Sequence, residues 1–449
     1  MIMIMGKYSL LFFIVCFLFF IPGFSSAQVK ITLDSCIARA LESNYSIKII
    51  RNQQRQAENN LNYGPFLPTI GIDAAQKQSI TDSKVVSDGE DRRADNSRSD
   101  ALSAGVSLNW RLFDGMEMFM THNRYAEMLA IGELNTKAAV ENLIVEVSSY
   151  YYDVVRQHSK LEAARHSLEL SSARYAEARD KYVIGVLSGL EAQQAKLDLN
   201  ADSSNYMKEK ELLKSAYISL NTIMNTDLQK HMYVDDSIRL HMPLQYQDLL
   251  TDLLQYNTTL QIGRRDRKVS ELDMKIARAA LFPKLDFDAG YNYNRTKSPA
   301  SVTSLNRSNG PYWGFSLSVD IFNRLENRRK IRNAKLDMEN AALSYQEAEQ
   351  QVKADLAQLY NTYENNLQIV SFEEESERVA FDNLDAALEK YKLGTLPGID
   401  GLNMLHGKIP PGLFILFIEC TMFCRVCQSV FAAGKSPLWG HHNAFSRKP

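Results

Sequence analysis

The sequence predicts a mixed α/β membrane protein in which pairs of β-strands alternate with very long helices. Three observations predict this class. One large unit occurs twice along the chain, four segments alternate apolar and polar residues, and a long stretch of helical character follows each pair of alternating segments.

Residues 1–27 have the layout of a cleavable secretory signal. Lys7 precedes an apolar run of 12 residues, and small residues close the segment at Ser25, Ser26 and Ala27. We therefore predict a mature chain that begins at Gln28. A membrane anchor is the alternative, but the run is short of the roughly 20 residues that a spanning helix needs. No charge-free apolar stretch of 18 residues follows the signal, so a membrane crossing would use strands.

Composition and motifs exclude several classes of function. The net charge of -2 offers no basic excess for nucleic acid. Cys36 is the one cysteine between the signal and residue 420, so no disulfide framework is expected. The chain has no phosphate-binding loop and no His-Glu-x-x-His. Three histidines on predicted long helices, at His122, His158 and His166, are expected at solvated surfaces. We expect neither enzymatic activity nor a cofactor.

An internal repeat organises the chain. Two landmarks recur 209 residues apart, and a third is six residues out of that offset because a polar insert occupies residues 81–99. The three pairs are Leu112-Phe113-Asp114 with Ile321-Phe322-Asn323, Lys181-Tyr182-Val183-Ile184-Gly185 with Lys390-Tyr391-Lys392-Leu393-Gly394, and Phe66-Leu67-Pro68 with Leu281-Phe282-Pro283. The period far exceeds that of solenoid repeats, so it indicates duplication of a large unit. The first copy spans residues 28–230 and the second spans residues 244–406.

Each copy contains two predicted strands, at about 69–80 and 101–113 in the first and about 284–296 and 311–322 in the second. From Leu102 to Leu112 every second residue is apolar. Such alternation is typical of barrel strands that face lipid on one side and a polar lumen on the other. A half-buried strand of a soluble sandwich shows the same pattern. However, a membrane barrel needs at least roughly eight strands, so four strands per chain would have to be pooled between subunits.

Long helices follow both strand pairs. Residues 116–182 contain no Pro and no Gly cluster, and such a helix would extend about 100 Å. Apolar and small residues form heptad stripes at Leu161, Ala164, Leu168, Tyr175, Ala178 and Tyr182, and at Val352, Leu356, Leu359, Tyr363 and Val370. A soluble coiled coil would show these stripes too, and the alternating strands are what argue against it.

The order of these parts resembles the TolC family of outer-membrane efflux proteins over residues 28–405. It begins with Thr32-Leu33-Asp34 and Asn44-Tyr45, and continues with Phe66-Leu67-Pro68, the strands and the Lys-Tyr-x-x-Gly landmark. The resemblance implies a homotrimer in the outer membrane, whose four strands per protomer form a 12-stranded β-barrel. A long periplasmic α-helical barrel would continue it.

The resemblance implies a passive exit duct for efflux or type I secretion. The duct would work with a periplasmic adaptor, a membrane fusion protein, and with an inner-membrane transporter as pump. A periplasmic coiled-coil scaffold or adaptor without a channel is the alternative. The sequence does not identify the cargo.

The resemblance also implies an adaptor contact at two turns between helices. The residues are Gly185, Val186, Leu187 and Ser188 in the first copy and Gly394, Thr395, Leu396 and Pro397 in the second. Glycine permits the backbone dihedrals that such a reversal needs. Simple helix breaks are the alternative interpretation.

A channel gate is implied at the same end of the helices. Asp400 matches an acidic position that narrows the passage in the family, and the uncharged Asn403 stands at a second such position. Glu191 and Tyr391 are compatible with the family's closing contacts, whereas Leu396 replaces an arginine. Asp400 could instead be a solvated acid at a helix start, and Tyr391 a packed core residue.

Residues 407–449 depart from the repeat. Pro410-Pro411-Gly412 stops a helix that the first copy completes, and an aromatic, cysteine-rich tail follows. This change indicates a reading-frame shift near His406 or a variant terminus. Cys420, Cys424 and Cys427 have the spacing of an iron-sulfur motif, and His441 and His442 could complete a zinc site. A metal-dependent enzyme is thus a third alternative, but no βα units follow and we expect no metal.

Overall fold

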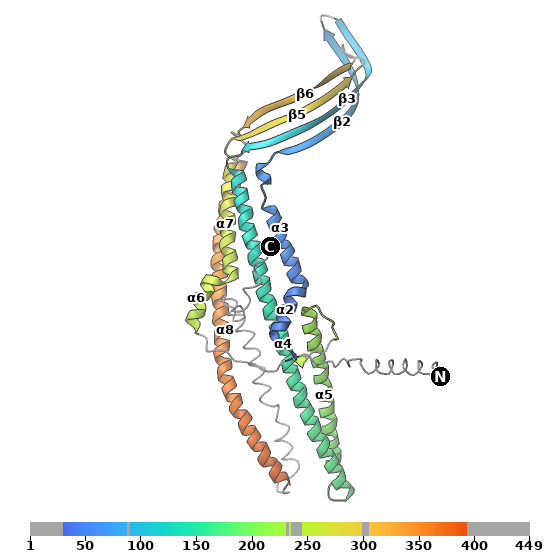
Figure 1. Cartoon of the computed structure of the whole chain (residues 1–449), viewed down its shortest axis with the longest axis vertical. Helices are drawn as coiled ribbons and strands as arrows, with labels where there is room; N and C mark the ends of the chain where they lie inside the picture. Colours follow the sequence, from blue (N-terminus) through green and yellow to red (C-terminus); the bar gives the residue numbers. More distant parts are fainter. Residues whose placement is uncertain (1–29, 88–89, 230–232, 235–244, 299–304, 393–449) are drawn as a thin grey trace, which may run out of the picture. The chain divides into compact units, whose positions relative to one another are not determined.

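The computed structural model describes residues 30–87, 90–229, 233–234, 245–298 and 305–392. The chain divides into two compact units. Among the described residues, the first unit holds those within 30–43, 146–234 and 372–392, and the second holds those within 44–145 and 245–371. Two helices of 67 residues, α4 (Glu117–Val183) and α8 (Glu326–Lys392), contribute residues to both units (Figure 1).

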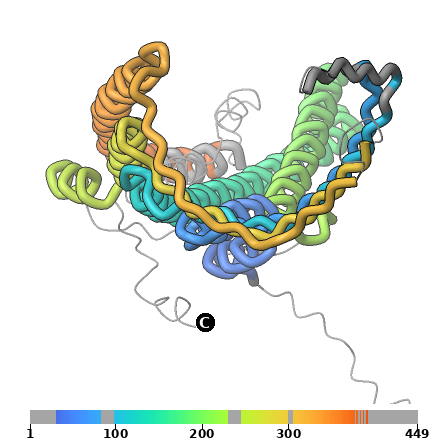
Figure 2. The backbone as a smooth tube through the Cα atoms, turned by 90° about the horizontal axis from the view of Figure 1, so that it is seen from above, coloured from blue at the N-terminus to red at the C-terminus, as the bar shows by residue number. Residues whose placement is uncertain are grey.

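The second unit contains a four-stranded antiparallel sheet in the order β2-β3-β5-β6. Its strands are β2 (Thr69–Ser87), β3 (Glu90–Phe113), β5 (Lys284–Lys297) and β6 (Leu305–Ser318). Seen along its edge in Figure 2, the sheet curves into an arc. The β2–β3 hairpin continues past the other two strands, because pairing of β3 with β5 stops at Asp100 and Lys297.

The polar insert at residues 81–99 is not a loop, which corrects the predicted strand bounds of the first copy. β2 extends to Ser87 and β3 begins at Glu90, so most of the insert is paired strand. A two-stranded hairpin with both faces in water needs no apolar alternation, so its strands carry no period-two signal. A register shift between Thr81 and Ser83 marks a bulge. Asn96, with φ of 57°, donates its backbone N–H to Asp82 Oδ1 at 2.6 Å near this bulge.

The last strand was predicted at residues 311–322 but spans Leu305–Ser318. Lys284, which follows Pro283, pairs with Ser318, and no β5 residue remains to pair with residues 319–322. The alternation of apolar residues thus continues beyond the strand that a single chain forms. β5 ends one residue later than predicted, at Lys297.

The two hairpins have the same register under the repeat. Thr69 follows Pro68 and pairs with Asn109, and Lys284 follows Pro283 and pairs with Ser318, 209 residues after Asn109. β3 continues past Asn109 to Phe113, because β5 lies along its other edge. β6 ends at Ser318, where its pairing with β5 ends.

A two-residue left-handed turn connects each hairpin to its long helix. Gly115 and Met116 have φ of 71° and 73°, and Arg324 and Leu325 have φ of 59° and 64°. The Asp114 carboxylate then accepts the Met118 backbone N–H at 3.1 Å and caps α4. The Leu-Phe-Asp landmark of the sequence therefore marks a helix start.

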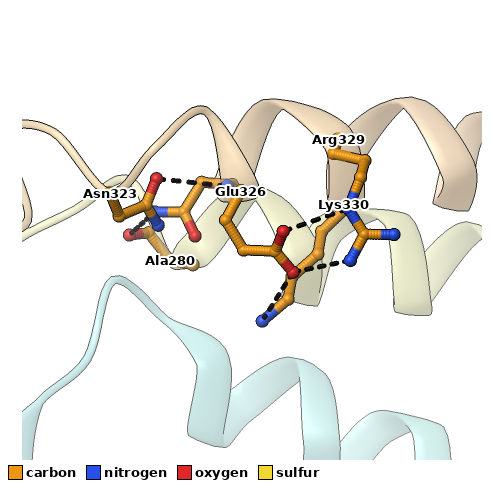
Figure 3. Close-up of polar contacts among 6 residues, drawn as sticks. Ala280, Asn323, Glu326, Arg329 and Lys330 are labelled. Atoms are coloured by element: carbon orange, nitrogen blue, oxygen red, sulfur yellow. Dashed lines mark hydrogen bonds and ion pairs between the residues drawn. The ribbon is translucent and has the colours of Figure 1, made fainter.

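Asn323 takes the same capping position at the start of α8 and accepts the Asn327 backbone N–H at 3.3 Å (Figure 3). The Asn327 side-chain amide donates to Ala280 O at 3.3 Å. Glu326 pairs with Arg329 at 2.7 Å within the first turn of α8. These contacts fix the first turn of α8 and hold it against the chain just after α7 (Thr258–Ala279).

Ion pairs and an apolar cluster hold the helices of the second unit together. Besides α7 they include α3 (Tyr45–Asn60), the short 3-10 helix η1 (Gly64–Phe66) and α6 (Tyr246–Tyr256). Between α4 and α7, Arg124 lies 2.6 Å from Asp273 and Glu127 lies 2.8 Å from Arg265. Leu249, Leu253 and Leu356 form a buried cluster that joins α6 to α8.

The first unit contains α2 (Leu33–Ser43), α5 (Gly189–Ile223) and a small parallel sheet of β1 (Lys30–Ile31) and β4 (Tyr233–Val234). Ile31 O accepts the Tyr151 hydroxyl at 3.3 Å, and Met224 O accepts the Ser43 hydroxyl at 2.6 Å. Two-residue strands are too short for an alternation signal, so the sequence did not indicate them. Within the described ranges, no helix combines enough length with enough apolar character to cross a membrane.

Candidate functional site

One face of the sheet is continuously apolar across all four strands. Cross-strand pairs bring the alternating apolar residues of each strand onto this face, for example Ile72 with Val106, Val106 with Tyr291, and Phe287 with Phe315. The face includes Ile70, Ile72, Leu102, Val106, Leu108, Trp110, Leu285, Phe287, Tyr291, Trp313, Phe315 and Leu317. Ile72 is 84% exposed and Trp313 is 74% exposed in the single chain. An apolar surface of this extent requires an apolar environment.

The opposite face is polar. It carries Asp73, Ser103, Ser107, Asn109, Arg111, Asp286, Asp288, Asn292, Asn294, Ser316 and Ser318. Arg111 Nε lies 2.9 Å from Asp286 Oδ1 across β3 and β5. These two residues line a cavity of about 600 Å³ at the base of the sheet, together with Asp114, Glu117 and Asp288. The lining of this cavity is predominantly acidic, with Asp114, Glu117, Asp286 and Asp288 against Arg111.

An aromatic cluster lies where the first hairpin meets its helix. The Trp110 indole N–H donates to Phe66 O at 2.9 Å and ties η1 to β3. Tyr63 stacks on His122 with ring centroids 5.6 Å apart, and Phe66 meets Phe119 edge-on at 5.1 Å. His122 is therefore a half-buried member of an aromatic cluster, with its Nδ1 3.4 Å from Asn62 O, and it is less solvated than expected.

The turn between α4 and α5 brings together the first set of predicted adaptor-contact residues. Gly185 has φ of 77°, its N–H donates to Tyr182 O at 3.0 Å, and the Val186 N–H donates to Lys181 O at 2.9 Å. This is the Schellman pattern that ends a helix at glycine. Val183, Ile184, Val186 and Leu190 are all at least 71% exposed, so the turn presents an apolar surface to water.

Glu191 lies at the start of α5 and forms a capping box. The Ser188 hydroxyl and backbone N–H donate to Glu191 Oε2 at 2.8 and 3.1 Å, and the Glu191 N–H donates to Ser188 Oγ at 3.3 Å. Ser188 thus caps α5, a role that the sequence prediction did not assign to it.

Of the remaining predicted site residues, Tyr391 alone lies within the described part of the chain. Tyr391 is the penultimate residue of α8. Gly394, Thr395, Leu396, Pro397, Asp400 and Asn403 lie outside the described residues, as do Cys420, Cys424, Cys427, His441 and His442. The proposed grouping of Glu191, Tyr391 and Asp400 into a gate therefore stays a prediction.

The fold is similar to that of solved outer-membrane channels. The CmeC outer membrane channel of Campylobacter jejuni superposes with a TM-score of 0.74 at 16% identity, covering 90% of this chain and 85% of that chain. The outer membrane protein VceC of Vibrio cholerae superposes with a TM-score of 0.70 at 14% identity, covering 90% and 96%. The long helices and the four-stranded amphipathic sheet together define the fold that these channels share.

Sequence comparison leads to the family. The model of the family "Outer membrane efflux protein" matches residues 37–226 and 249–403, which is well over half of the sequence. The chain belongs to this family, and the predicted resemblance to TolC-family proteins is confirmed.

Two relatives illustrate the range of the family. The pyoverdine export outer membrane protein OpmQ of Pseudomonas aeruginosa is 23% identical over 372 residues, covering 81% of this chain and 76% of that protein. The outer membrane protein TolC of Vibrio cholerae is 20% identical over 308 residues, covering 68% and 70%. Location in the outer membrane is thus confirmed, and the relatives are export proteins and channels instead of enzymes.

Proposed function

We propose that the protein is a passive exit duct of the outer membrane, for efflux or type I secretion. It works with a periplasmic adaptor and an inner-membrane pump, which supplies the energy. The single observation that carries this proposal is the sheet, whose four strands share one apolar face and one polar face.

The apolar face has the dimensions of a lipid-facing band. From Leu102 to Leu112, β3 advances about 33 Å at roughly 3.3 Å per residue. A tilt of about 40° reduces this height to about 25 Å, which is the height of the apolar band on outer-membrane barrels. The polar face would then line a hydrated lumen, with the Arg111–Asp286 pair at its base.

The barrel itself requires several copies of the chain. Four strands cannot close, and within the described residues β2 and β6 each pair along one edge only. Since all neighbouring strands are antiparallel, β6 of one copy and β2 of the next continue the same alternation. Three copies make the 12-stranded barrel that the family resemblance implies.

The long helices supply the periplasmic part. A 67-residue helix such as α4 extends about 100 Å. Buried residues follow the predicted stripes at Ala164 in α4 and at Leu356, Tyr363 and Val370 in α8. The remaining exposed apolar residues of these helices suit packing against neighbouring protomers in an α-helical barrel.

The turn at residues 185–188 is the proposed adaptor contact. Val186 and the preceding Ile184 are exposed, while the backbone of the turn is fixed by the Schellman pattern and by the Ser188–Glu191 capping box. A rigid apolar tip is suited to docking on another protein, because little conformational entropy is lost on binding. The second-copy turn at residues 394–397 would make the equivalent contact.

Asp400 is the proposed centre of the gate, with Asn403, Tyr391 and Glu191 around it. An acidic ring at a constriction attracts cations and retards their passage. We expect Asp400→Ala to raise cation conductance through the closed duct, measured on single channels in planar bilayers. Asn403→Ala serves as the uncharged control, and equal conductance in the Asp400→Ala protein and the unaltered protein would remove Asp400 from the gate.

The tail needs a separate test at the level of the gene. We propose that the reading frame shifts near His406, because the composition changes abruptly inside an element that the first copy completes. Resequencing from the codon for Leu393 onward, with all three frames read, decides this. A second frame that encodes about 40 residues of leucine- and alanine-rich helix supports the shift, since the repeat leaves room for such a helix. A confirmed frame with no such helix contradicts it.

Extraction of membranes tests the function and separates it from a periplasmic scaffold. A barrel subunit stays in the outer-membrane fraction after washes with urea and with alkaline carbonate, and it migrates as a heat-sensitive oligomer on gels run without boiling. Release of the protein by either wash would favour the scaffold. Copurification of stoichiometric iron or zinc would instead support a metal-dependent enzyme that uses the C-terminal cysteines.

A further inference from the structure

The apolar face of the sheet ends in a group of cationic residues. Along β5, in the direction away from α7, this face runs from Phe287 through Tyr291 and Tyr293 to Arg295 and Lys297. At the end next to the helices, the described strands place no charged residue on this face. The order of apolar, tyrosine and cationic residues is typical of a surface that passes from the hydrocarbon core of a membrane into its headgroup region.

This group contains four cationic residues and one acid on the same face of three strands. The four cations, which we call the basic cluster, are Arg98, Arg295, Lys297 and Arg307. The acid is Asp100, which lies opposite Lys297 and accepts the Gln76 side-chain amide at 3.3 Å. Among the residues that the structure describes, no ion pair includes a member of the basic cluster. The cluster therefore presents an excess of positive charge.

Arg295 and Arg307 form the centre of the basic cluster. They are directly opposite each other on β5 and β6, so their Cβ atoms lie about 4.5–5.5 Å apart. Like charges in this arrangement destabilise a sheet. In addition, the Arg295 Nε is buried and has no hydrogen-bond partner among the described residues. An anion held between the two guanidinium groups would remove the repulsion and accept the Nε proton in a hydrogen bond.

The basic cluster lies at the level where the apolar band ends. Arg295 pairs with Leu102, the residue at which the apolar alternation of β3 stops in the direction away from α4. The polar headgroups of a bilayer begin where its hydrocarbon core ends. When the apolar band lies in the core, the guanidinium groups are therefore beside the lipid phosphates.

We propose that the basic cluster binds a phosphomonoester on the headgroup of an outer-leaflet lipid. The inference rests on the proposed duct, because a barrel whose helices lie in the periplasm places this end of the sheet at the outer surface. Arginine suits a phosphate, since its planar guanidinium donates two parallel hydrogen bonds to the oxygens. A phosphomonoester carries a charge of about -1.5 to -2 at pH 7, so it balances the opposed pair of Arg295 and Arg307. A phosphodiester, with a single negative charge, leaves one arginine unbalanced.

A lipid fits this surface better than free phosphate does. Tyr291 and Trp313 lie on the same face as the basic cluster, on the side toward the helices, and are 48% and 74% exposed. The acyl chains of a bound lipid cover these residues while its phosphate contacts the arginines. Free phosphate would interact with the cluster through charge alone and would leave the apolar residues uncovered.

Native mass spectrometry of the full-length oligomer in a neutral detergent counts bound lipid molecules and gives their dissociation constant. The probes are diphosphoryl lipid A, the same lipid without its phosphates, phosphatidylglycerol and inorganic phosphate. Arg295→Gln combined with Arg307→Gln removes the opposed pair. Lys77→Gln combined with Lys284→Gln removes two cations from the polar face and is the matched control. Retention of each oligomer after carbonate washing shows that it is assembled.

We expect diphosphoryl lipid A to bind the unaltered chain at least about ten-fold more tightly than each of the other probes. The double arginine variant should bind it on the order of thirty-fold more weakly, because each cation near a membrane anion contributes about a factor of five. The lysine variant should bind it like the unaltered chain. Arg307→Gln alone, at an exposed position, should weaken binding about five-fold, and it replaces the double variant if that variant fails to assemble.

Equal affinity of the arginine and lysine variants for lipid A would reject the basic cluster as the lipid site and leave the duct intact. Inorganic phosphate that binds as tightly as lipid A would assign the cluster to free phosphate, and equally tight phosphatidylglycerol would reject the preference for a phosphomonoester. Failure of the unaltered chain to form a membrane-retained oligomer would instead reject the proposed duct, and the inference with it.

Discussion

Single residues decide how each hairpin turns into its helix. Gly115 has φ of 71°, and an added Cβ would come within 2.6 Å of Phe282 Cβ and 2.7 Å of Ala279 O. Glycine at this position is thus required both by the dihedral and by the close approach of the backbone after α7. The equivalent Arg324 has φ of 59° with a full side chain, so the second turn holds two left-handed residues that carry side chains, Arg324 and Leu325, where the first holds one, Met116.

Gly115→Ala should destabilise the protein more than Gly185→Ala, which is a matched control. Both glycines have φ above 70°, but nothing lies within 4 Å of a Cβ added at Gly185. We expect a loss of about 1 kcal/mol at Gly185 from the dihedral alone and several kcal/mol at Gly115 from the added clash. The urea midpoint of helical circular dichroism in detergent measures both. Equal losses would show that the contact with Phe282 and Ala279 relaxes freely.

Glu141 gives the second unit a pH-dependent contribution to stability. Burial raises the pKa of its carboxyl group, although the Thr258 hydroxyl at 3.0 Å and Lys137 at 3.7 Å both oppose the shift. A folded-state pKa above the unfolded value means that the folded chain binds the proton more tightly. The contribution of this proton to the free energy of unfolding is therefore fully present below the unfolded-state pKa, and it is lost as the pH rises through the folded-state pKa.

Glu141→Gln removes the charge and keeps the shape of the side chain. We expect the melting temperature of the variant minus that of the unaltered protein to be more positive at pH 7.5 than at pH 4, measured by thermal unfolding at both pH values. Glu271→Gln is the control with the opposite sign, because the hydrogen bond from Lys275 lowers the pKa of the Glu271 carboxyl group. A Glu141→Gln difference that is independent of pH would contradict the assignment.

Residue roles that depend on tertiary contacts could not be predicted from the sequence. The Trp110 indole fits a lipid-facing alternation, yet it also donates to Phe66 O, 44 residues earlier in the chain. His122 stood on a helix with polar neighbours, and its aromatic partner Tyr63 comes from a separate segment. The only available signal was the clustering of aromatics near Pro65 and Pro68, which does not show which ring packs on which.

At the scale of elements, periodicity predicted whatever has a long and regular pattern. The predicted helix at residues 116–182 differs from α4 by one residue at each end. All four strands of the large sheet were found, because their alternation reports the two environments of their faces. Strand ends were less predictable. β6 ends where its partner β5 ends, and the polar β2–β3 extension lacks the apolar face whose alternation would have indicated its strands.

The turn between α4 and α5 is the element on which a functional prediction depends. Ile184→Asp combined with Val186→Asp should abolish adaptor-dependent efflux, since charge on the tip opposes burial in a docked interface. Membrane insertion and channel conductance should remain, because both side chains are exposed in the chain. Efflux is measured as accumulation of a fluorescent pump substrate in cells that lack other exit ducts. Ile184→Leu with Val186→Ile should retain function, and efflux by the Asp variant would place the adaptor elsewhere.

At the scale of the whole molecule, duplication explains both the repeat and the need for assembly. Two copies of one unit yield four strands and two long helices, with equal hairpin registers and equal turns into the helices. The sheet remains open at β2 and β6 within the described residues, and its apolar face is exposed in a single chain. A closed barrel in lipid would pair both open edges and cover the apolar face, and this barrel is what we propose for the protein.

Single-channel conductance in planar bilayers, before and after thiol labelling, tests that claim most directly. Ser107→Cys and Val106→Cys are adjacent positions on the polar and apolar faces of β3 and are compared in the background without the C-terminal cysteines. Both proteins should give discrete conductance steps, and a bulky charged thiol reagent should reduce conductance through Ser107→Cys while leaving Val106→Cys unchanged. Absence of steps from membrane-embedded oligomers, or an equal response at both positions, would contradict a lumen lined by the polar face.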